Sequence, residues 1–197
     1  MKQENNKTYN IIVTGVGGQG LVTLLKIIAR AALDSGFDVR ASELHGLSQR
    51  GGSVSVFIRF GQKVFSPIIA KGKADLVLSL EYQESLAGAE FANKDTIFLI
   101  NEQQTPTLAE TISKEQVMDN LKKVSNNVKL VKASEICQKE LGKDVTAGLF
   151  LLGLALKQNI LPLSEDVIIE AVKKTMPEKY WDLNLKTLVL AGSFKLN

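Results

Sequence analysis

A glycine-rich turn near the start of the chain limits the folds that are open to it. The run Ile11–Thr14 is rich in β-branched residues and leads into glycines at positions 15, 17 and 20, which satisfy the pattern G-x-G-x-x-G. Apolar residues then recur at helical spacing from Leu21 to Ala32, and Ser35-Gly36 ends that pattern. A strand, a glycine turn and a helix in this order predict an α/β fold with the turn at the carboxyl end of a buried strand.

Strands and helices alternate through the rest of the chain. Residues 37–42 are a predicted strand, and with the first strand they form an expected βαβ unit whose two following loops lie at one sheet edge. Gly61-Gln62 predicts a hairpin turn into Lys63–Phe65, so part of the sheet is expected to be antiparallel. Ser113 and Gln116 form a predicted capping box, and Ser164 a predicted helix cap. Other predicted strands are 54–58, 76–80, 96–100 and 128–131; other predicted helices are 82–91, 114–124, 133–141, 165–175 and 183–194.

The resulting fold class is α/β. We expect three layers, Rossmann-like, around a mostly parallel sheet with an antiparallel hairpin portion and a C-terminal helical extension. Residues 1–197 are expected to form a single domain, with the α/β core over about 9–142 and the helical extension over about 143–197.

The first glycine loop is a candidate ligand site. Glycine lets the backbone approach a ligand closely, and the free N–H groups of the helix start attract a pyrophosphate or a carboxylate. Glu43 lies near the end of the second predicted strand, where dinucleotide enzymes bind ribose hydroxyls, so an NAD or FAD site is one interpretation. The structural alternative is that the glycines only permit tight packing of strand against helix. The candidate ligand residues here are Gly15, Gly17, Gly18, Gln19 and Gly20.

A second polar loop runs from Glu43 to Gly52 and contains the one histidine of the chain. Its hydroxyl, amide and guanidinium groups stand on successive residues before two glycines, a combination that suits an oxyanion. For Arg50, a subunit contact or a surface ion pair is as strongly expected as ligand binding. For His45, a structural or interface role is favoured over a catalytic one. The candidate ligand residues are Ser48, Gln49, Arg50, Gly51 and Gly52, with Glu43 and His45 as interface or ligand residues.

Composition excludes several other classes of protein. The net charge of +3 is spread over scattered lysines without aromatic interleaving, so nucleic acid is not an expected partner. The longest apolar run, Ala147 to Leu156, is too short to span a bilayer, so no membrane role is expected either. The single cysteine, Cys137, excludes an internal disulfide and a self-contained iron–sulfur or zinc site, and is expected in the core. A cytoplasmic location is the expectation.

Taken together, the two loops resemble the 2-oxoacid:ferredoxin oxidoreductase family, in the subunit called gamma, or beta in the indolepyruvate enzymes. Residues 15–20, Gly-Val-Gly-Gly-Gln-Gly, are similar to the family's opening loop. Residues 42–52, Ser-Glu-Leu-His-Gly-Leu-Ser-Gln-Arg-Gly-Gly, are similar to its second signature in the indolepyruvate branch. Segments 66–68, 74–75, 161–164 and 184–186 resemble later parts of the family, so the resemblance covers nearly the whole chain.

The resemblance implies an accessory subunit that is inactive alone. The complete enzyme would oxidatively decarboxylate an arylpyruvate with CoA to aryl-acetyl-CoA, CO2 and reduced ferredoxin. Thiamine diphosphate, magnesium and iron–sulfur clusters would lie in a large partner subunit. Ferredoxin would interact with the complex, and CoA would be a ligand that this chain shares with the partner subunit. No residue of this chain is implied to be catalytic, and no metal site is expected. The gamma subunit of another 2-oxoacid enzyme, a stand-alone dinucleotide-binding protein and a purely scaffolding subunit are the alternatives.

Overall fold

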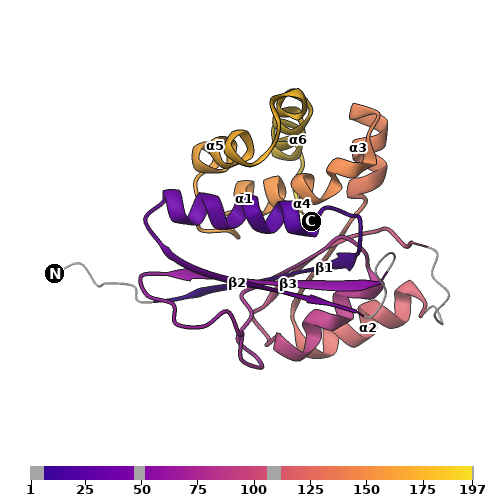
Figure 1. The fold of residues 1–197 in the computed structure, drawn as a ribbon. Coiled ribbons are helices and arrows are strands. Elements are labelled where there is room, and N and C mark those ends of the chain that lie inside the picture. The colour runs from indigo at the N-terminus through magenta and orange to yellow at the C-terminus, as the bar shows by residue number, and fades with distance from the viewer. Residues whose placement is uncertain (1–6, 47–51, 106–111, 197) are drawn as a thin grey trace.

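A computed structural model describes residues 7–46, 52–105 and 112–196, which form three layers (Figure 1). The middle layer is a six-stranded sheet in the order β2-β3-β1-β4-β5-β6. The strands are β1 (Tyr9–Val16), β2 (Asp38–His45), β3 (Ser53–Gly61), β4 (Leu76–Ser79), β5 (Ile97–Asn101) and β6 (Asn127–Val131). The α-helices are α1 (Leu21–Asp34), α2 (Lys114–Val124), α3 (Ala133–Leu141), α4 (Ala147–Lys157), α5 (Glu165–Thr175) and α6 (Trp181–Gly192). Three 3₁₀ segments are η1 (Gln83–Phe91), η2 (Asp144–Thr146) and η3 (Glu178–Tyr180).

The sheet confirms the predicted fold class. β1, β4, β5 and β6 pair as parallel neighbours, whereas β3 is antiparallel to both β1 and β2. Because β3 lies between them, β1 and β2 run in the same direction without being neighbours, which differs from a simple βαβ unit. The turn after β1 and the connection from β2 to β3 still lie at one edge, the carboxyl edge of the parallel strands.

The predicted hairpin at Gly61–Gln62 is wrong. β3 ends at Gly61, and the next strand is β4, so the antiparallel pair is formed by β2 and β3 instead. The Arg59 side chain explains the difference, because its Nη1 donates to the carbonyl oxygens of Ser66 and Ile68 at 2.8 and 2.9 Å. A guanidinium therefore satisfies backbone acceptors that a strand partner would otherwise satisfy.

Most helices and strands begin and end close to where the sequence predicts them. The Ser113 hydroxyl accepts from the Gln116 N–H at 3.2 Å and the Gln116 side chain accepts from the Ser113 N–H at 3.1 Å, so the capping box is confirmed. Ser164 caps α5 by accepting from the Val167 N–H. Residues 83–91 form the 3₁₀ segment η1 rather than an α-helix, and β2 extends three residues beyond its predicted end.

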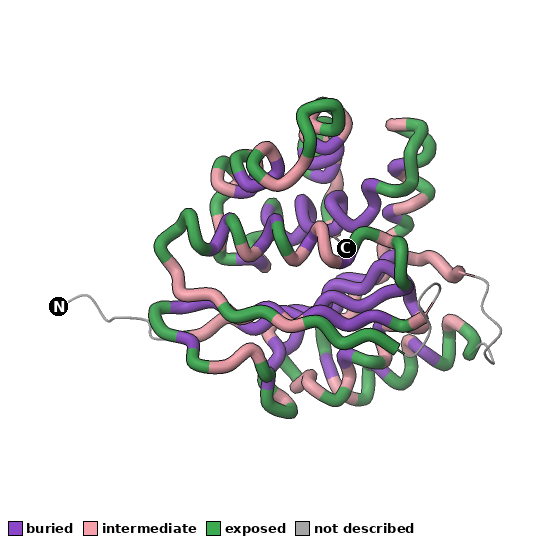
Figure 2. The backbone as a smooth tube through the Cα atoms, viewed as in Figure 1, coloured by how far each residue is buried: buried purple, intermediate pink, exposed green. Residues whose placement is uncertain are grey.

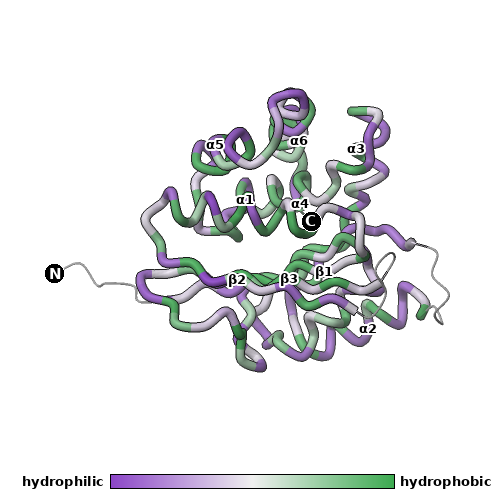
Figure 3. The backbone as a smooth tube through the Cα atoms, viewed as in Figure 1, coloured by the Kyte–Doolittle hydropathy of each residue, from purple (hydrophilic) through white to green (hydrophobic). Residues whose placement is uncertain are grey.

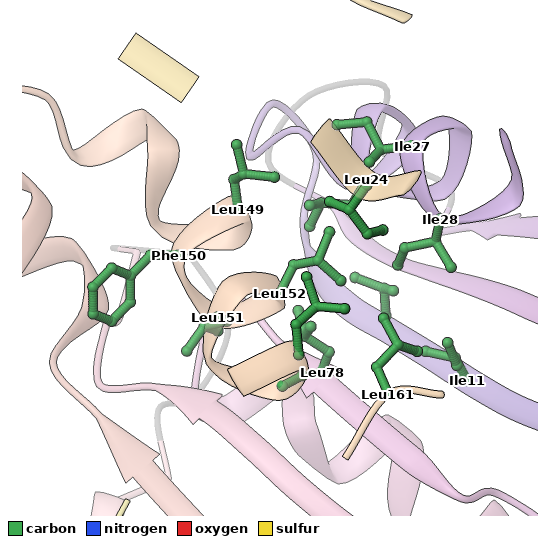
Figure 4. Close-up of a cluster of buried hydrophobic side chains, with 14 of the residues drawn as sticks. Ile11, Leu24, Ile27, Ile28, Leu78, Leu149, Phe150, Leu151, Leu152 and Leu161 are labelled. Atoms are coloured by element: carbon green, nitrogen blue, oxygen red, sulfur yellow. The ribbon is translucent and has the colours of Figure 1, made fainter. Parts of the chain in front are cut away.

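Helices cover both faces of the sheet. Helices α1, α3, α4, α5 and α6 lie on one side, and α2 lies on the other (Figure 1). All residues from Ala147 to Leu156 of α4 are buried, which makes α4 the centre of the larger core cluster. Figure 4 shows Leu152 of this helix beside Leu24 of α1 and Leu78 of β4. Exposed residues concentrate on β2 and on the outer turns of the surface helices (Figure 2), where hydrophilic residues also gather (Figure 3).

The C-terminal helices share this core with the sheet. Leu188 and Ala191 of α6 are buried with Ile11 of β1 in one cluster, and a Cβ built on Gly153 of α4 would lie 2.7 Å from the Ala191 Cβ. Cys137 is fully buried, as predicted. The division into a core and an extension at about residue 142 stays a prediction.

Candidate functional site

The two glycine loops meet at the carboxyl edge of the sheet. The backbone N–H of Gly17 donates to the carbonyl oxygen of Gly52 at 3.0 Å, which joins the first loop directly to the end of the second. Gly46 and Ser53 close the base of the second loop, since the Gly46 N–H donates to the Ser53 carbonyl at 2.9 Å. Ser48, Gln49, Arg50 and Gly51 lie outside the described residues. The structure therefore brings the predicted loops together at their described ends.

Backbone geometry explains the glycines of the first loop. Gly18 and Gly20 have φ angles of 103° and 85°, a left-handed region that favours glycine. A Cβ built on Gly15 would lie 2.6 Å from Gln19 Oε1 and 3.2 Å from the Leu80 Cβ. Gly20 is the N-cap of α1 and supplies no side-chain cap. The first N–H groups of α1 are thus available to an anion.

Gln19 has a structural role inside the loop. Its Oε1 accepts from the Val16 N–H at 2.8 Å, and its Nε2 donates to the Thr105 hydroxyl at 3.3 Å. These two bonds close the glycine turn and link it to the segment that follows β5. Its predicted contact with a ligand stays a prediction.

Glu43 and His45 lie on β2 rather than in a loop. They form a pair in which His45 Nε2 and Glu43 Oε2 are 2.9 Å apart, and both side chains are partly exposed. Because β3 separates β2 from β1, Glu43 is two strand spacings, or roughly 10 Å, from the first strand. This displaces Glu43 from the position that binds ribose next to a dinucleotide loop.

Glu81 is a site residue that the sequence patterns did not reveal. It follows β4 at the same edge, its side chain is 2% exposed, and its Oε1 accepts from the Thr105 N–H. Its Oε2 has no hydrogen-bond partner among residues 7–46, 52–105 and 112–196. Burial, and then the neighbouring charge of Glu84, raise the pKa of the Glu81 carboxyl. An acidic residue directly after a buried strand at the site edge was the available signal.

Glu84 ties the second loop to the same segment. The Ser53 hydroxyl, next to Gly52, donates to Glu84 Oε2. The turn after β4 is therefore bonded to both loops, to the first through Thr105 and Gln19 and to the second through Ser53.

A cavity of about 260 Å³, with both polar and apolar walls, opens beside the first loop. The starts of three helices lie around it: Gly18 before α1, Ser134 in α3 and Ala147 in α4. Helix starts favour an anion, whereas the Asp144 carboxylate on the same wall opposes one. The other lining side chains are Gln19, Leu80, Asn101, Gln103, Thr105 and Val145, with Gly148.

Metal-binding clusters and membrane-spanning helices are both absent from the described residues. No group of three or more histidine, cysteine or carboxylate side chains is placed to hold a metal ion in this part of the chain. No helix within the described ranges is long and apolar enough to cross a membrane.

Comparisons with known proteins agree with the resemblance of the two loops. Residues 10–193 match the family model described as pyruvate ferredoxin/flavodoxin oxidoreductase. The chain is 39% identical over 185 residues to indolepyruvate oxidoreductase subunit IorB of Archaeoglobus fulgidus, which covers 91% of each chain. It is 30% identical to the pyruvate/ketoisovalerate oxidoreductases common subunit gamma of Pyrococcus abyssi, over 87% of this chain and 89% of that one.

The fold also matches solved structures. The crystal structure of pyruvate oxidoreductase subunit PORC from Thermotoga maritima superposes with a TM-score of 0.70 at 22% identity. The match covers 97% of this chain and 98% of that chain. With a family model over nearly the full length and a relative at 39% identity, the chain belongs to the pyruvate ferredoxin/flavodoxin oxidoreductase family, as a gamma-type subunit of a 2-oxoacid:ferredoxin oxidoreductase.

Proposed function

We propose that the chain is the accessory subunit of an indolepyruvate-type 2-oxoacid:ferredoxin oxidoreductase. In the overall reaction an arylpyruvate and CoA become an aryl-acetyl-CoA, CO2 and a proton, and the two electrons released reduce two one-electron ferredoxin centres. The observation that carries the proposal is the Gly17–Gly52 hydrogen bond, which joins the first family signature to the last residue of the second. The indolepyruvate relative at 39% identity supports the aryl branch.

Redox chemistry is assigned to the partner. Four thiolates hold an ordinary iron–sulfur cluster, and this chain has one cysteine, Cys137, which is buried in the core. We therefore place thiamine diphosphate, magnesium and the iron–sulfur clusters in a large partner subunit, through which ferredoxin is also reached. No residue of this chain takes a catalytic role in the proposal.

The joined loops are proposed to position an anionic ligand at the partner's active site. The free N–H groups at the start of α1 and the Arg50 guanidinium would bind the diphosphate of CoA. Gly15, Gly17, Gly18 and Gly20 would shape that surface. Ser48, Gln49, Gly51 and Gly52 would complete it, with Gln19 holding the turn and Glu43 and His45 at its outer side.

A gamma subunit of another 2-oxoacid enzyme is the second candidate. The 30% identity with the Pyrococcus abyssi gamma subunit favours it. A stand-alone dinucleotide-binding protein is disfavoured by the displacement of Glu43 from β1.

The test is reconstitution with the thiamine-bearing subunit. The purified chain, given indolepyruvate, CoA and ferredoxin, is expected to reduce no ferredoxin, and adding the partner is expected to restore turnover. Turnover by the chain alone would reject an accessory role, and tight NAD binding without the partner would favour the dinucleotide class. Comparing kcat/KM for indolepyruvate, pyruvate and a branched 2-oxoacid separates the two oxidoreductase candidates.

Arg50→Ala separates a ligand site from a scaffold within the same assay. We expect an intact complex whose KM for CoA rises about tenfold, because a charge-assisted bond to phosphate is lost. Arg40→Ala is the matched control, since Arg40 lies on β2 and binds Asp38. Loss of assembly with Arg50→Ala would instead favour a scaffolding loop.

A further inference from the structure

The Glu81 carboxyl lies where the turn after β4 meets the segment that follows β5. Its Oε1 accepts from the Thr105 N–H. Beside it, the Tyr82 N–H donates to the Gln103 carbonyl at 3.1 Å, and the Tyr82 hydroxyl donates to Gln104 Oε1. Three successive residues after β5 are therefore held by two successive residues after β4.

The backbone at Glu81 is fixed by the neighbouring strands. The Thr14 hydroxyl of β1 donates to Ser79 Oγ at 2.8 Å, and the Ser79 hydroxyl donates to the Glu81 carbonyl at 2.5 Å. Asn101 Nδ2 of β5 donates to the Leu80 carbonyl at 3.1 Å. Because Thr14 and Ser79 are fully buried, the main chain has little freedom here, and a change of state at Glu81 acts through its side chain.

Thr105 links Glu81 to the first glycine loop. The Thr105 hydroxyl accepts from Gln19 Nε2 at 3.3 Å, and Gln19 Oε1 accepts from the Val16 N–H at 2.8 Å. The side chain that closes the glycine turn is thus bonded to the residue that Glu81 holds. Loss of the Glu81–Thr105 bond would free the Thr105 end of Gln19 and loosen the closure of the turn.

An ionised Glu81 has no counter-ion among the described residues. Its side chain is 2% exposed, and within those residues its Oε2 has no hydrogen-bond partner. Neighbouring segments bring like charge: Glu84 lies on η1, Asp144 of η2 lies on the cavity wall with Thr105, and Glu102 is already paired with Lys114 at 2.6 Å. The fold therefore favours the neutral carboxyl, and burial, followed by the charge of Glu84, raises its pKa.

We infer that Glu81 is a positioning residue whose protonation state sets the geometry of the first glycine loop. The neutral carboxyl stays buried and holds Thr105, which in turn holds Gln19. When the carboxyl gives its proton to solvent, the buried charge lacks a partner, so the side chain moves toward water and releases Thr105. The consequence for ligand binding rests on the proposed function, because the loop that loosens is the one proposed to bind CoA.

The test is amide exchange of the chain alone, followed by NMR from about pH 5 to about pH 9. The reporters are the Thr105 N–H, which Glu81 binds, and the Val16 N–H, which Gln19 binds. After correction for base catalysis, both should exchange about tenfold faster above a single-proton transition, the equivalent of one lost hydrogen bond. The transition should lie above 4.5, the ordinary pKa of a glutamate, because the folded chain favours the neutral form.

Three variants separate the contacts. Glu81→Gln keeps a neutral acceptor and should hold both amides slow at every pH. Thr105→Val keeps the N–H and removes the hydroxyl, so Val16 should exchange fast at every pH while the amide at position 105 keeps the transition. Glu90→Gln on the same η1 segment is the matched control, because Glu90 is exposed and pairs with Lys71, and it should behave as the unmodified chain does.

The inference is overturned if the unmodified chain shows no transition, if Thr105 exchanges more slowly above it, or if the transition persists in Glu81→Gln. In the reconstituted complex, the KM for CoA of the unmodified protein, divided by that of Glu81→Gln, should rise through the same transition while the ratio of the kcat values stays constant. An exchange transition that the KM for CoA does not follow would support the role of Glu81 and count against the proposed CoA site.

Discussion

Gly15→Val is expected to destabilise the protein by about 3 kcal/mol and to open the first glycine loop. The added side chain would displace Gln19 Oε1, which lies 2.6 Å from the position of the new Cβ, and press on Leu80 and Leu21 at 3.2 and 3.3 Å. Overpacking of this kind costs about 1–3 kcal/mol, and losing the Gln19 bond to the Val16 N–H adds about 1 kcal/mol. For a chain of this size the melting temperature should fall by about 6–12 °C.

Gly192→Val is the control for Gly15→Val. Its Cβ would meet only the flexible end of Lys157, at 3.0 Å, which can move aside. Thermal unfolding followed by circular dichroism measures both variants. A Gly15→Val protein that melts within about 2 °C of the unmodified chain would show that the turn does not depend on this close approach.

Leu152→Ala is expected to cost about 3 kcal/mol of unfolding free energy. Leu152 is fully buried in α4, where Figure 4 shows it beside Leu24 and Leu78. Truncating a buried leucine removes its transfer free energy and leaves a cavity, at a cost of about 2–5 kcal/mol. Urea unfolding should show a lower midpoint with an unchanged slope.

Leu33→Ala is the matched control, because Leu33 on α1 is 55% exposed. It should change the unfolding free energy by less than about 0.5 kcal/mol. Equal losses in the two variants would contradict the central position of α4 in the core.

Local signals made much of this fold predictable. The strand, glycine turn and helix over residues 11–32 are encoded by β-branched residues, glycines and helical spacing. The capping box at Ser113 and the cap at Ser164 depend on groups three residues away. The meeting of the two loops was also predictable, since parallel strands present their carboxyl ends at one edge.

Features that depend on distant residues were not predictable in the same way. β3 lies between β1 and β2 in the sheet. The residues within β1 and β2 do not specify this strand order. Where a hairpin was predicted, the Arg59 side chain donates to the carbonyl oxygens of Ser66 and Ile68, seven and nine residues along the chain.

The site shows the same limit. Glu81 is buried after β4, and its Oε2 has no hydrogen-bond partner among the described residues. Its Oε1 accepts from the N–H of Thr105, 24 positions along the chain. Only the folded chain brings these groups together.

Hydrogen exchange on the chain alone and in the complex tests the central claim, that the joined loops face the partner's reaction centre. Peptides covering residues 15–21 and 43–53 should both exchange more slowly when the thiamine-bearing subunit is added, and CoA should slow them further. Unchanged exchange in both segments, with protection only at the β6 edge of the sheet or on the outer face of α2, would contradict the account.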